Sequence, residues 1–178
     1  MRPRAFLWLK ALLFTITIPG GALGLIPGLL ISDGRGRVPH GLGVLEILGL
    51  ALIVAGAGLY ASCLRQFVQV GGGTPAPIDA PRALVAVGAY RYVRNPMYLG
   101  VVAALAGETM LFRSPTLAAY TVLMGAAFHL FVMLYEEPNL RARFGEGYRR
   151  YQTEVPRWLP RRPGPGRMTD DGRLTTDN

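Results

Sequence analysis

The stretch ILGLALIVAGAGLYASCL, residues 47–64, contains no charged side chain and no proline. At about 1.5 Å per residue, a helix over this stretch is about 27 Å long, close to the roughly 30 Å of a hydrocarbon core. Three further stretches carry no charge: 11–32, 95–107 and 114–135. We therefore predict transmembrane helices over 6–31, 41–64, 97–113 and 115–136, in an all-α integral membrane bundle. Residues 1–162 are expected to form a single domain, followed by a polar, disordered tail over 163–178.

The composition supports a membrane class. The chain has 178 residues, of which 51% are hydrophobic and 17% charged, which is too apolar for an ordinary soluble domain of this size. The net charge of +8 does not indicate nucleic-acid binding, because the basic residues gather beside the predicted spans. If the N-terminus is cytoplasmic, Arg35, Arg37 and Arg113 are the only Lys or Arg residues that the predicted spans place on the opposite side of the membrane. The positive-inside rule therefore predicts that both termini are cytoplasmic.

The first predicted span has a competing interpretation as a cleaved signal peptide. The opening MRPR and Lys10 resemble the positive region of such a peptide. The apolar stretch that follows is longer than the apolar region of a signal peptide, and ALG at 22–24 is a weak cleavage signal. We therefore keep this segment as a span.

Small residues and prolines predict how the spans pack. The glycines that favour close approach of helices are Gly20, Gly24 and Gly28 in the first span and Gly49 and Gly56 in the second. Glycine-rich faces of this kind favour helix pairing within one chain and also the formation of a homo-oligomer. Pro19 and Pro27 predict kinks in the first span, because proline removes a backbone donor.

Only a few polar residues in the predicted spans are candidates for a chemical role. Cys63 is the only cysteine, and His40 and His129 are far apart, so we predict no metal site. His129 lies in the fourth span and must find a partner on a neighbouring helix or in a cavity. Glu108 is an intramembrane carboxylate, which is a functional candidate by default unless it lies near the interface.

Residues 65–95 form a long segment between the second and third spans. The glycines at 71–73 and the prolines up to position 81 exclude a continuous helix, and a loop of this length is usually functional or disordered. Its aromatic and apolar content favours function. Pro96 suits the first turn of the third span, with Asn95 as its predicted N-cap. Such a helix start presents free amides to an anion.

The fourth span is followed by a predicted amphipathic helix within 135–161. Leu140, Phe144, Tyr148 and Tyr151 fall at spacings of four, four and three, so they share one face. Where the span ends, the carboxylates of residues 136 and 137 can pair with an ammonium or a nearby arginine, or face water.

Two motifs carry a resemblance to a known family. GAYRYVRNPMYLG at 88–100 and EEPNLRARFGEGYRRYQTEVPRWLPR at 136–161 lie about 35 residues apart. Together they resemble the membrane methyltransferases grouped around isoprenylcysteine carboxyl methyltransferase, which are related to phospholipid N-methyltransferases. The resemblance covers roughly residues 70–162. It implies a helical bundle whose cytoplasmic C-terminal part closes over S-adenosylmethionine, with transfer of the methyl group to a lipophilic or lipid acceptor.

The resemblance also implies site residues. The implied cofactor contacts are Arg82, Ala83, Leu84, Val85, Tyr90, Asn95, Pro96, Met97, Tyr98 and Glu136, with Glu137 as the adjacent carboxylate. Candidate residues on the acceptor side are His129, Val132, Arg157 and Trp158. Arg157 and Trp158 are either interfacial anchors or the lip of an acceptor channel. No residue is an obvious catalytic base.

The chain departs from the prenylcysteine enzymes at two positions. Asn95 stands where those enzymes have a histidine, and Asn cannot titrate near neutral pH, which argues against proton transfer there. Val132 stands where they have a substrate-contacting arginine, so an acceptor carboxylate lacks an obvious partner. The acceptor therefore stays open among a lipid amine, a carboxylate and a thiol. A noncatalytic membrane protein that retains the fold and a small transporter subunit are the alternative functions.

Overall fold

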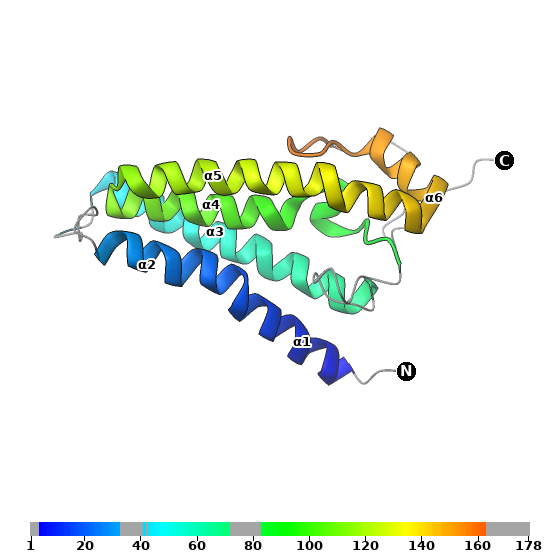
Figure 1. Ribbon diagram of the computed structural model, residues 1–178, viewed down its shortest axis with the longest axis horizontal. Helices are drawn as coiled ribbons and strands as arrows, with labels where there is room; N and C mark the ends of the chain where they lie inside the picture. Colours follow the sequence, from blue (N-terminus) through cyan, green and yellow to red (C-terminus); the bar gives the residue numbers. More distant parts are fainter. Residues whose placement is uncertain (1–3, 33–40, 42, 72–82, 163–178) are drawn as a thin grey trace.

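Three long apolar helices and one shorter one form the body of the described part of the chain, where they lie side by side (Figure 1). The computed structural model describes residues 4–32, 41, 43–71 and 83–162. The elements in chain order are α1 (Arg4–Thr17), η1 (Gly21–Leu25), α2 (Ile26–Leu30), α3 (Val44–Gln66), η3 (Phe67–Gly71), η5 (Gly88–Arg91), α4 (Pro96–Phe112), α5 (Pro115–Phe131), η6 (Val132–Glu136) and α6 (Glu137–Glu154). The described residues contain helices and no strand, which confirms the all-α prediction. The predicted tail over 163–178 lies outside the described residues.

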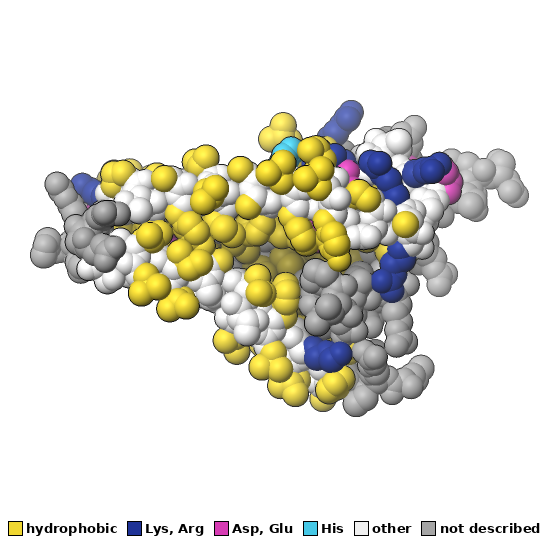
Figure 2. Space-filling model, in the orientation of Figure 1, with side chains coloured by type: hydrophobic (Ala, Val, Ile, Leu, Met, Phe, Trp, Pro, Cys, Tyr) yellow, Lys and Arg dark blue, Asp and Glu magenta, His cyan; other side chains and the backbone are white. Residues whose placement is uncertain are grey.

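Three helices are long and apolar enough to cross a membrane: Ala5–Leu30, Val44–Val70 and Pro115–Glu154. The fourth, α4, is shorter at 17 residues. Together α5 and η6 extend about 33 Å at about 1.5 Å per residue, which matches a hydrocarbon core about 30 Å thick. The last helix therefore leaves the membrane near Glu136, and α6 lies beyond it. Figure 2 shows hydrophobic side chains along the bundle, with most of the basic side chains at the end that carries α6.

The contact between α3 and α4 depends on glycine. A Cβ atom at Gly49 would lie 2.6 Å from the Gly107 carbonyl oxygen, and one at Gly100 would lie 2.7 Å from the Gly56 carbonyl oxygen. The two helices are therefore antiparallel and in backbone contact at two levels, two turns apart. The close packing predicted for Gly49 and Gly56 is confirmed, and the partner glycines lie on α4.

The glycine stripe of the first helix behaves differently. A Cβ at Gly24 or Gly28 would meet no other described atom within 4 Å outside the backbone of its own helix. The prediction that this face packs closely within the chain is therefore wrong for the described residues. Both glycines are exposed, and the buried residues of η1 and α2 are Ala22 and Pro27. Pairing with a second copy stays a prediction.

Two π-helical turns each end two residues before a proline: η1 before Pro27, and η6 before Pro138. Proline has no N–H and its ring presses on the carbonyl four residues earlier, so a regular α-helix cannot continue. The wider π turn preserves the helix instead, with Ile26 N–H donating to the Gly21 carbonyl in η1 and Glu137 N–H donating to the Val132 carbonyl in η6. The kinks predicted at Pro19 and Pro27 agree with this path, because α1 ends two residues before Pro19 and the chain bends between α1 and α2 (Figure 1).

Two hydrogen bonds join the first helix to the rest of the bundle. Thr15 and Tyr60 share a hydrogen bond of 2.9 Å between their hydroxyls. The Tyr120 hydroxyl donates to the Ala22 carbonyl at 3.2 Å. That carbonyl is available because Ile26 donates to Gly21 and Pro27 has no N–H. These contacts hold the first helix beside α3 and α5.

At the far end of the bundle, α4 and α5 are joined by a tight turn. Arg113 ends α4 in a left-handed conformation with φ 46°, and Ser114 caps α5 by accepting a hydrogen bond from Leu117 N–H at 3.3 Å. The Arg113 guanidinium lies 2.7 Å from the Glu46 carboxylate at the start of α3. This ion pair closes the end of the bundle opposite α6.

The described residues that lead into α4 turn at Gly88. Gly88 has φ +57°, and a Cβ there would clash with the Gln66 side chain. Replacing Gly88 by alanine is expected to destabilise the protein by about 1–2 kcal/mol, because a side chain is disfavoured in the left-handed region. Thermal unfolding in detergent measures this effect. The control is Gly125→Ala, at a helical position with open space, which should keep or raise the melting temperature.

Candidate active site

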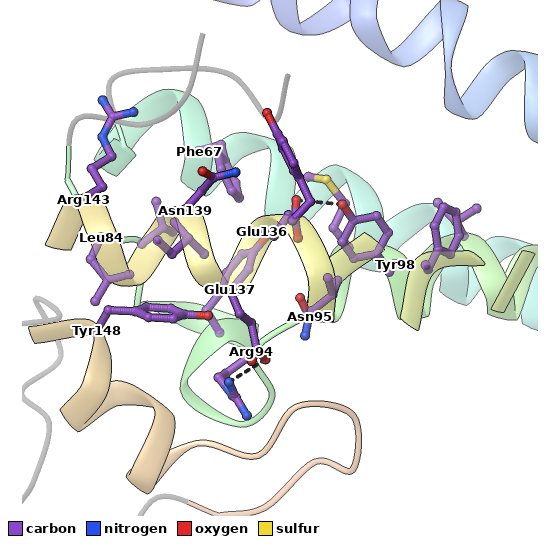
Figure 3. A pocket seen from close by; sticks show the side chains of 18 of the residues that line it. Phe67, Leu84, Arg94, Asn95, Tyr98, Glu136, Glu137, Asn139, Arg143 and Tyr148 are labelled. Atoms are coloured by element: carbon purple, nitrogen blue, oxygen red, sulfur yellow. Dashed lines mark hydrogen bonds and ion pairs between the residues drawn. The ribbon is translucent and has the colours of Figure 1, made fainter. Parts of the chain in front are cut away.

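A cavity of about 590 Å³ opens between the first helix, α4, α5 and α6. Its polar lining includes residues just before and within the first turn of α4 and residues of η6 and α6: Arg94, Asn95, Tyr98, Glu136, Glu137, Asn139 and Arg143. Its apolar lining comes from within the bundle: Phe14, Ile18, Ala22, Val101, Met124 and Phe128. Figure 3 shows the labelled polar side chains of α4 and η6–α6 facing one another across this space. The cavity therefore joins a polar region at the membrane boundary to an apolar region inside the bundle.

Asn95 occupies the position before α4 that the sequence predicts. Its side chain, however, accepts no capping hydrogen bond. The amide nitrogen instead donates to the main-chain carbonyl of Arg157 at 3.1 Å, and the residue is 9% exposed. Asn95 is therefore the N-cap residue by position, as predicted, but its side chain makes no capping hydrogen bond, since its amide is oriented by the segment after α6. Its φ and ψ of −123° and 51° differ from the extended backbone that Pro96 favours.

Glu136 and Tyr98 face each other across the cavity. The Tyr98 hydroxyl donates to Glu136 Oε1 at 2.8 Å, and the Tyr98 ring packs on Phe128 with centroids 4.7 Å apart. Among the described residues, Tyr98 is the only hydrogen-bond partner of Glu136. The second carboxylate oxygen, Oε2, is therefore available to a ligand.

Glu137 has quite different surroundings. It is 2% exposed, and its Oε1 accepts hydrogen bonds from Arg94 Nη1 at 2.8 Å and Arg157 Nε at 2.7 Å. Its Oε2 accepts from Arg157 Nη2 at 2.9 Å and Gln152 Nε2 at 3.2 Å, with Arg141 Nη2 at 3.6 Å. Of the two pairings expected for this carboxylate, the structure shows the one with arginine.

The arginines decide the charge of Glu137. Burial alone raises the pKa of this carboxyl, but the hydrogen bond from Arg157 and the charges of Arg94, Arg157 and Arg141 outweigh it and hold the pKa below its usual value. The hydrogen bond to Glu137 in turn raises the pKa of Arg157. The pair is therefore ionised at neutral pH.

The second half of α6 holds the segment before α4. Leu140, Phe144, Tyr148 and Tyr151 pack in one cluster with Ala86. The helix is not continuous as predicted, because Gly145 has φ 54° and ψ −125°. Only a glycine adopts this conformation readily, and it turns Tyr148 and Tyr151 back onto the residues around Ala86.

Tyr151 makes the polar contact of this cluster. Its hydroxyl donates to the buried Tyr90 carbonyl at 2.7 Å. Replacing Tyr151 by phenylalanine is expected to cost about 1–3 kcal/mol of unfolding free energy, because the buried carbonyl is left without a donor. Denaturant unfolding followed by tryptophan fluorescence measures this loss. Tyr92→Phe, at a ring that is 44% exposed, is the matched control and should change the free energy little.

Residues 155–162 return along the outside of α5 after α6 ends (Figure 1). Arg94 N–H donates to the Pro156 carbonyl and Arg161 N–H to the Tyr92 carbonyl, both at 2.9 Å. The Trp158 indole N–H donates to His129 Nδ1 at 2.9 Å. His129 therefore finds its partner on this segment, and we call residues 155–162 the return segment.

The structure brings together most of the predicted site residues. Leu84, Val85, Tyr90, Asn95, Met97, Tyr98, Val132, Glu136 and Glu137 line the same cavity. Ala83, Pro96, His129, Arg157 and Trp158 are described but are not part of its lining. Arg82 lies outside the described residues. The role of each as a cofactor or acceptor contact stays a prediction.

Sequence reasoning missed the contribution of the first helix to the cavity. Phe14, Ile18 and Ala22 lie four residues apart and line one side of it. Their spacing marks a helix face, but any apolar span has such faces, and the family resemblance began only near residue 70. Arg94 was also missed as a lining residue, although the motif contained it.

Other polar groups lie away from this cavity. Cys63 is buried beside Val85 and Tyr90 as an apolar residue. Within the described part of the chain, no three His, Cys, Asp or Glu side chains are placed to hold a metal ion. Glu108 has a buried carboxylate oxygen without a hydrogen-bond partner among the described residues.

Comparison with known proteins agrees with this geometry. A family model described as phospholipid methyltransferase matches residues 44–147, from the start of α3 into α6. No curated protein and no solved structure matches the chain. The matched range includes both adjacent carboxylates and the start of α4, and it covers more than half of the sequence. The chain therefore belongs to the phospholipid methyltransferase family.

Proposed function

We propose that the protein transfers a methyl group from S-adenosylmethionine to a lipophilic acceptor at the cytoplasmic face of the membrane. The observation that carries the proposal is the cavity itself, because one space joins the half-buried carboxylate of Glu136 to an apolar region among the spans. The family supports methyltransferase activity on membrane lipids. The cytoplasmic side follows from the positive-inside bias of the sequence.

The polar part of the cavity fits the methyl donor. The donor carries an ammonium, a carboxylate, a sulfonium and an adenine. Glu136 offers an unpaired carboxylate oxygen to the ammonium, and the start of α4 offers main-chain amides to a carboxylate. Tyr90, Phe67 and Leu84 supply aromatic and apolar surface for a base. When bound, the donor supplies a methyl group that is already activated by its sulfonium.

The apolar part fits the acceptor. Phe14, Ile18, Val101, Met124 and Phe128 line a path that a hydrocarbon chain can occupy without meeting a charged group. The acceptor headgroup then lies at the level of Tyr98 and Glu136. The protein contributes alignment of the reacting atoms and exclusion of water.

The charges in the cavity favour an amine over a carboxylate as the acceptor. Arg94 and Arg157 both pair with Glu137, so neither offers its charge freely to an acceptor carboxylate. Arg143 also lines the cavity, and its guanidinium lies over the Phe144 ring, 5.8 Å from the ring centroid. The neighbouring Glu136 would repel such a group. A neutral lipid amine meets no such repulsion: its nitrogen bonds to the methyl carbon as the carbon–sulfur bond breaks, and the surplus proton leaves to water.

The test is methyl transfer by the purified protein in phospholipid vesicles. Radiolabelled S-adenosylmethionine is supplied with vesicles containing phosphatidylethanolamine, with vesicles in which phosphatidylcholine replaces it, or with phosphatidylcholine vesicles that contain a free fatty acid as the carboxylate lipid. Label is expected in the lipid fraction only with the amine lipid. Transfer to a carboxylate lipid instead would overturn the choice of acceptor, and absence of donor binding would overturn the proposed function. Donor binding without transfer to any lipid would favour a noncatalytic protein.

A further inference from the structure

The adjacent carboxylates of Glu136 and Glu137 differ in how many hydrogen bonds they accept. Glu137 accepts from Arg94, from two nitrogens of Arg157 and from Gln152. A carboxylate has about four acceptor positions, and these contacts fill them. Glu137 therefore has no capacity left for a ligand, although it borders the cavity. Glu136 keeps a free oxygen.

Hydrogen bonds connect Glu137 through Arg157 to Asn95, which also lines the cavity. The fork between Glu137 and Arg157 is bidentate, which fixes the direction as well as the distance of the guanidinium. The main-chain carbonyl of the same arginine accepts the hydrogen bond from the Asn95 amide nitrogen. Glu137 and Asn95 are thus connected through one residue of the return segment.

This connection determines which atom Asn95 presents. With its nitrogen held by Arg157, the amide oxygen lies on the opposite side, away from the return segment (Figure 3). Among the described residues this oxygen has no hydrogen-bond partner. It can therefore accept a hydrogen bond from a ligand in the cavity.

We infer that Glu137 is a positioning residue that acts through Arg157 to hold Asn95 toward the ligand, and that it does not contact the methyl donor. This inference rests on the proposed function, because it assigns roles within the same site. Glu136 contacts the donor directly, and Glu137 fixes the return segment that holds the Asn95 amide. The side chains of the two neighbours diverge because consecutive residues of a helix point about 100° apart around its axis.

A double-mutant cycle between Glu137→Gln and Asn95→Ala tests the inference. Each single substitution is expected to lower kcat/KM for the donor, by about 100-fold for a misplaced group in a site of this kind. The double variant should be no worse than the Asn95 variant alone, because Glu137 acts through Asn95. In contrast, Glu136→Gln and Glu137→Gln should multiply their effects, since they act by separate routes.

The cycle distinguishes positioning from simple stabilisation. The melting temperature is measured for every variant, and Glu154→Gln, which removes an exposed ion pair with Arg150 in the same helix, should leave kcat/KM unchanged. Multiplicative effects of the Glu137 and Asn95 substitutions would overturn the inference, as would a lower melting temperature of Glu137→Gln with unchanged kcat/KM. If Glu137→Gln does not fold, Arg157→Gln breaks the same connection and replaces it in the cycle. Failure of the wild-type protein to bind the donor would instead contradict the proposed function.

Discussion

Replacing Glu136 by glutamine is expected to lower kcat/KM for methyl transfer by about 100-fold or more. The substitution keeps the size of the side chain and removes its charge. An ammonium held by this half-buried carboxylate then loses its partner, which costs about 2–5 kcal/mol. Tyr98 can still donate to the amide oxygen, so the local packing is preserved. Initial rates at varied S-adenosylmethionine concentrations measure the effect.

The matched control for this substitution is Glu146→Gln. Glu146 lies on the same helix with a side chain that is 85% exposed, and its contact with Arg149 is a surface ion pair at 3.7 Å. Such a pair contributes little, so activity should be unchanged. An unaltered kcat/KM in the Glu136 variant, with donor binding intact, would show that this carboxylate does not bind the cofactor.

Replacing Gly56 by alanine is expected to destabilise the bundle by about 1–3 kcal/mol or more. A Cβ at this position would clash with the Gly100 carbonyl and lie 2.9 Å from the Ala104 nitrogen. Both are backbone atoms of α4, which cannot move aside as a flexible side chain can. The helices would have to separate along the contact that also positions Asn95 and Tyr98.

Gly58→Ala is the internal control for this prediction. Gly58 is two residues away on α3, and a Cβ there would meet nothing within 4 Å. Its melting temperature should stay the same or rise, because alanine favours a helix. Equal melting temperatures for the Gly56 and Gly58 variants would contradict the close contact between α3 and α4.

The spans could be predicted because crossing a membrane places simple requirements on the sequence. A helix that crosses lipid needs about 20 apolar residues, and backbone groups in lipid must pair within the helix. The predicted 115–136 therefore agrees well with α5 and η6, and 97–113 with α4. The second span was predicted to end at 64 because the first charged residue, Arg65, follows it. The helix itself continues past this charge through η3.

The cavity was predictable only in part. The two motifs identified the start of α4 and the residues near Glu136, because these lie within short stretches of distinctive sequence. The lining from Phe14, Ile18 and Ala22 depends on where the first helix crosses the bundle. That path is decided by the bend at η1 and by the hydrogen bond from Tyr120, which joins residues far apart in the chain.

The different partners of Glu136 and Glu137 could not be predicted from the sequence. Both residues are the same type, in the same motif, and both were expected near the cofactor. The sequence alone was enough to predict that two carboxylates lie where the fourth span leaves the membrane. Their different tasks arise from folding, because Arg94, Gln152 and Arg157 reach Glu137 from three separate segments and fill its oxygens, whereas Glu136 receives only the Tyr98 hydroxyl among the described residues.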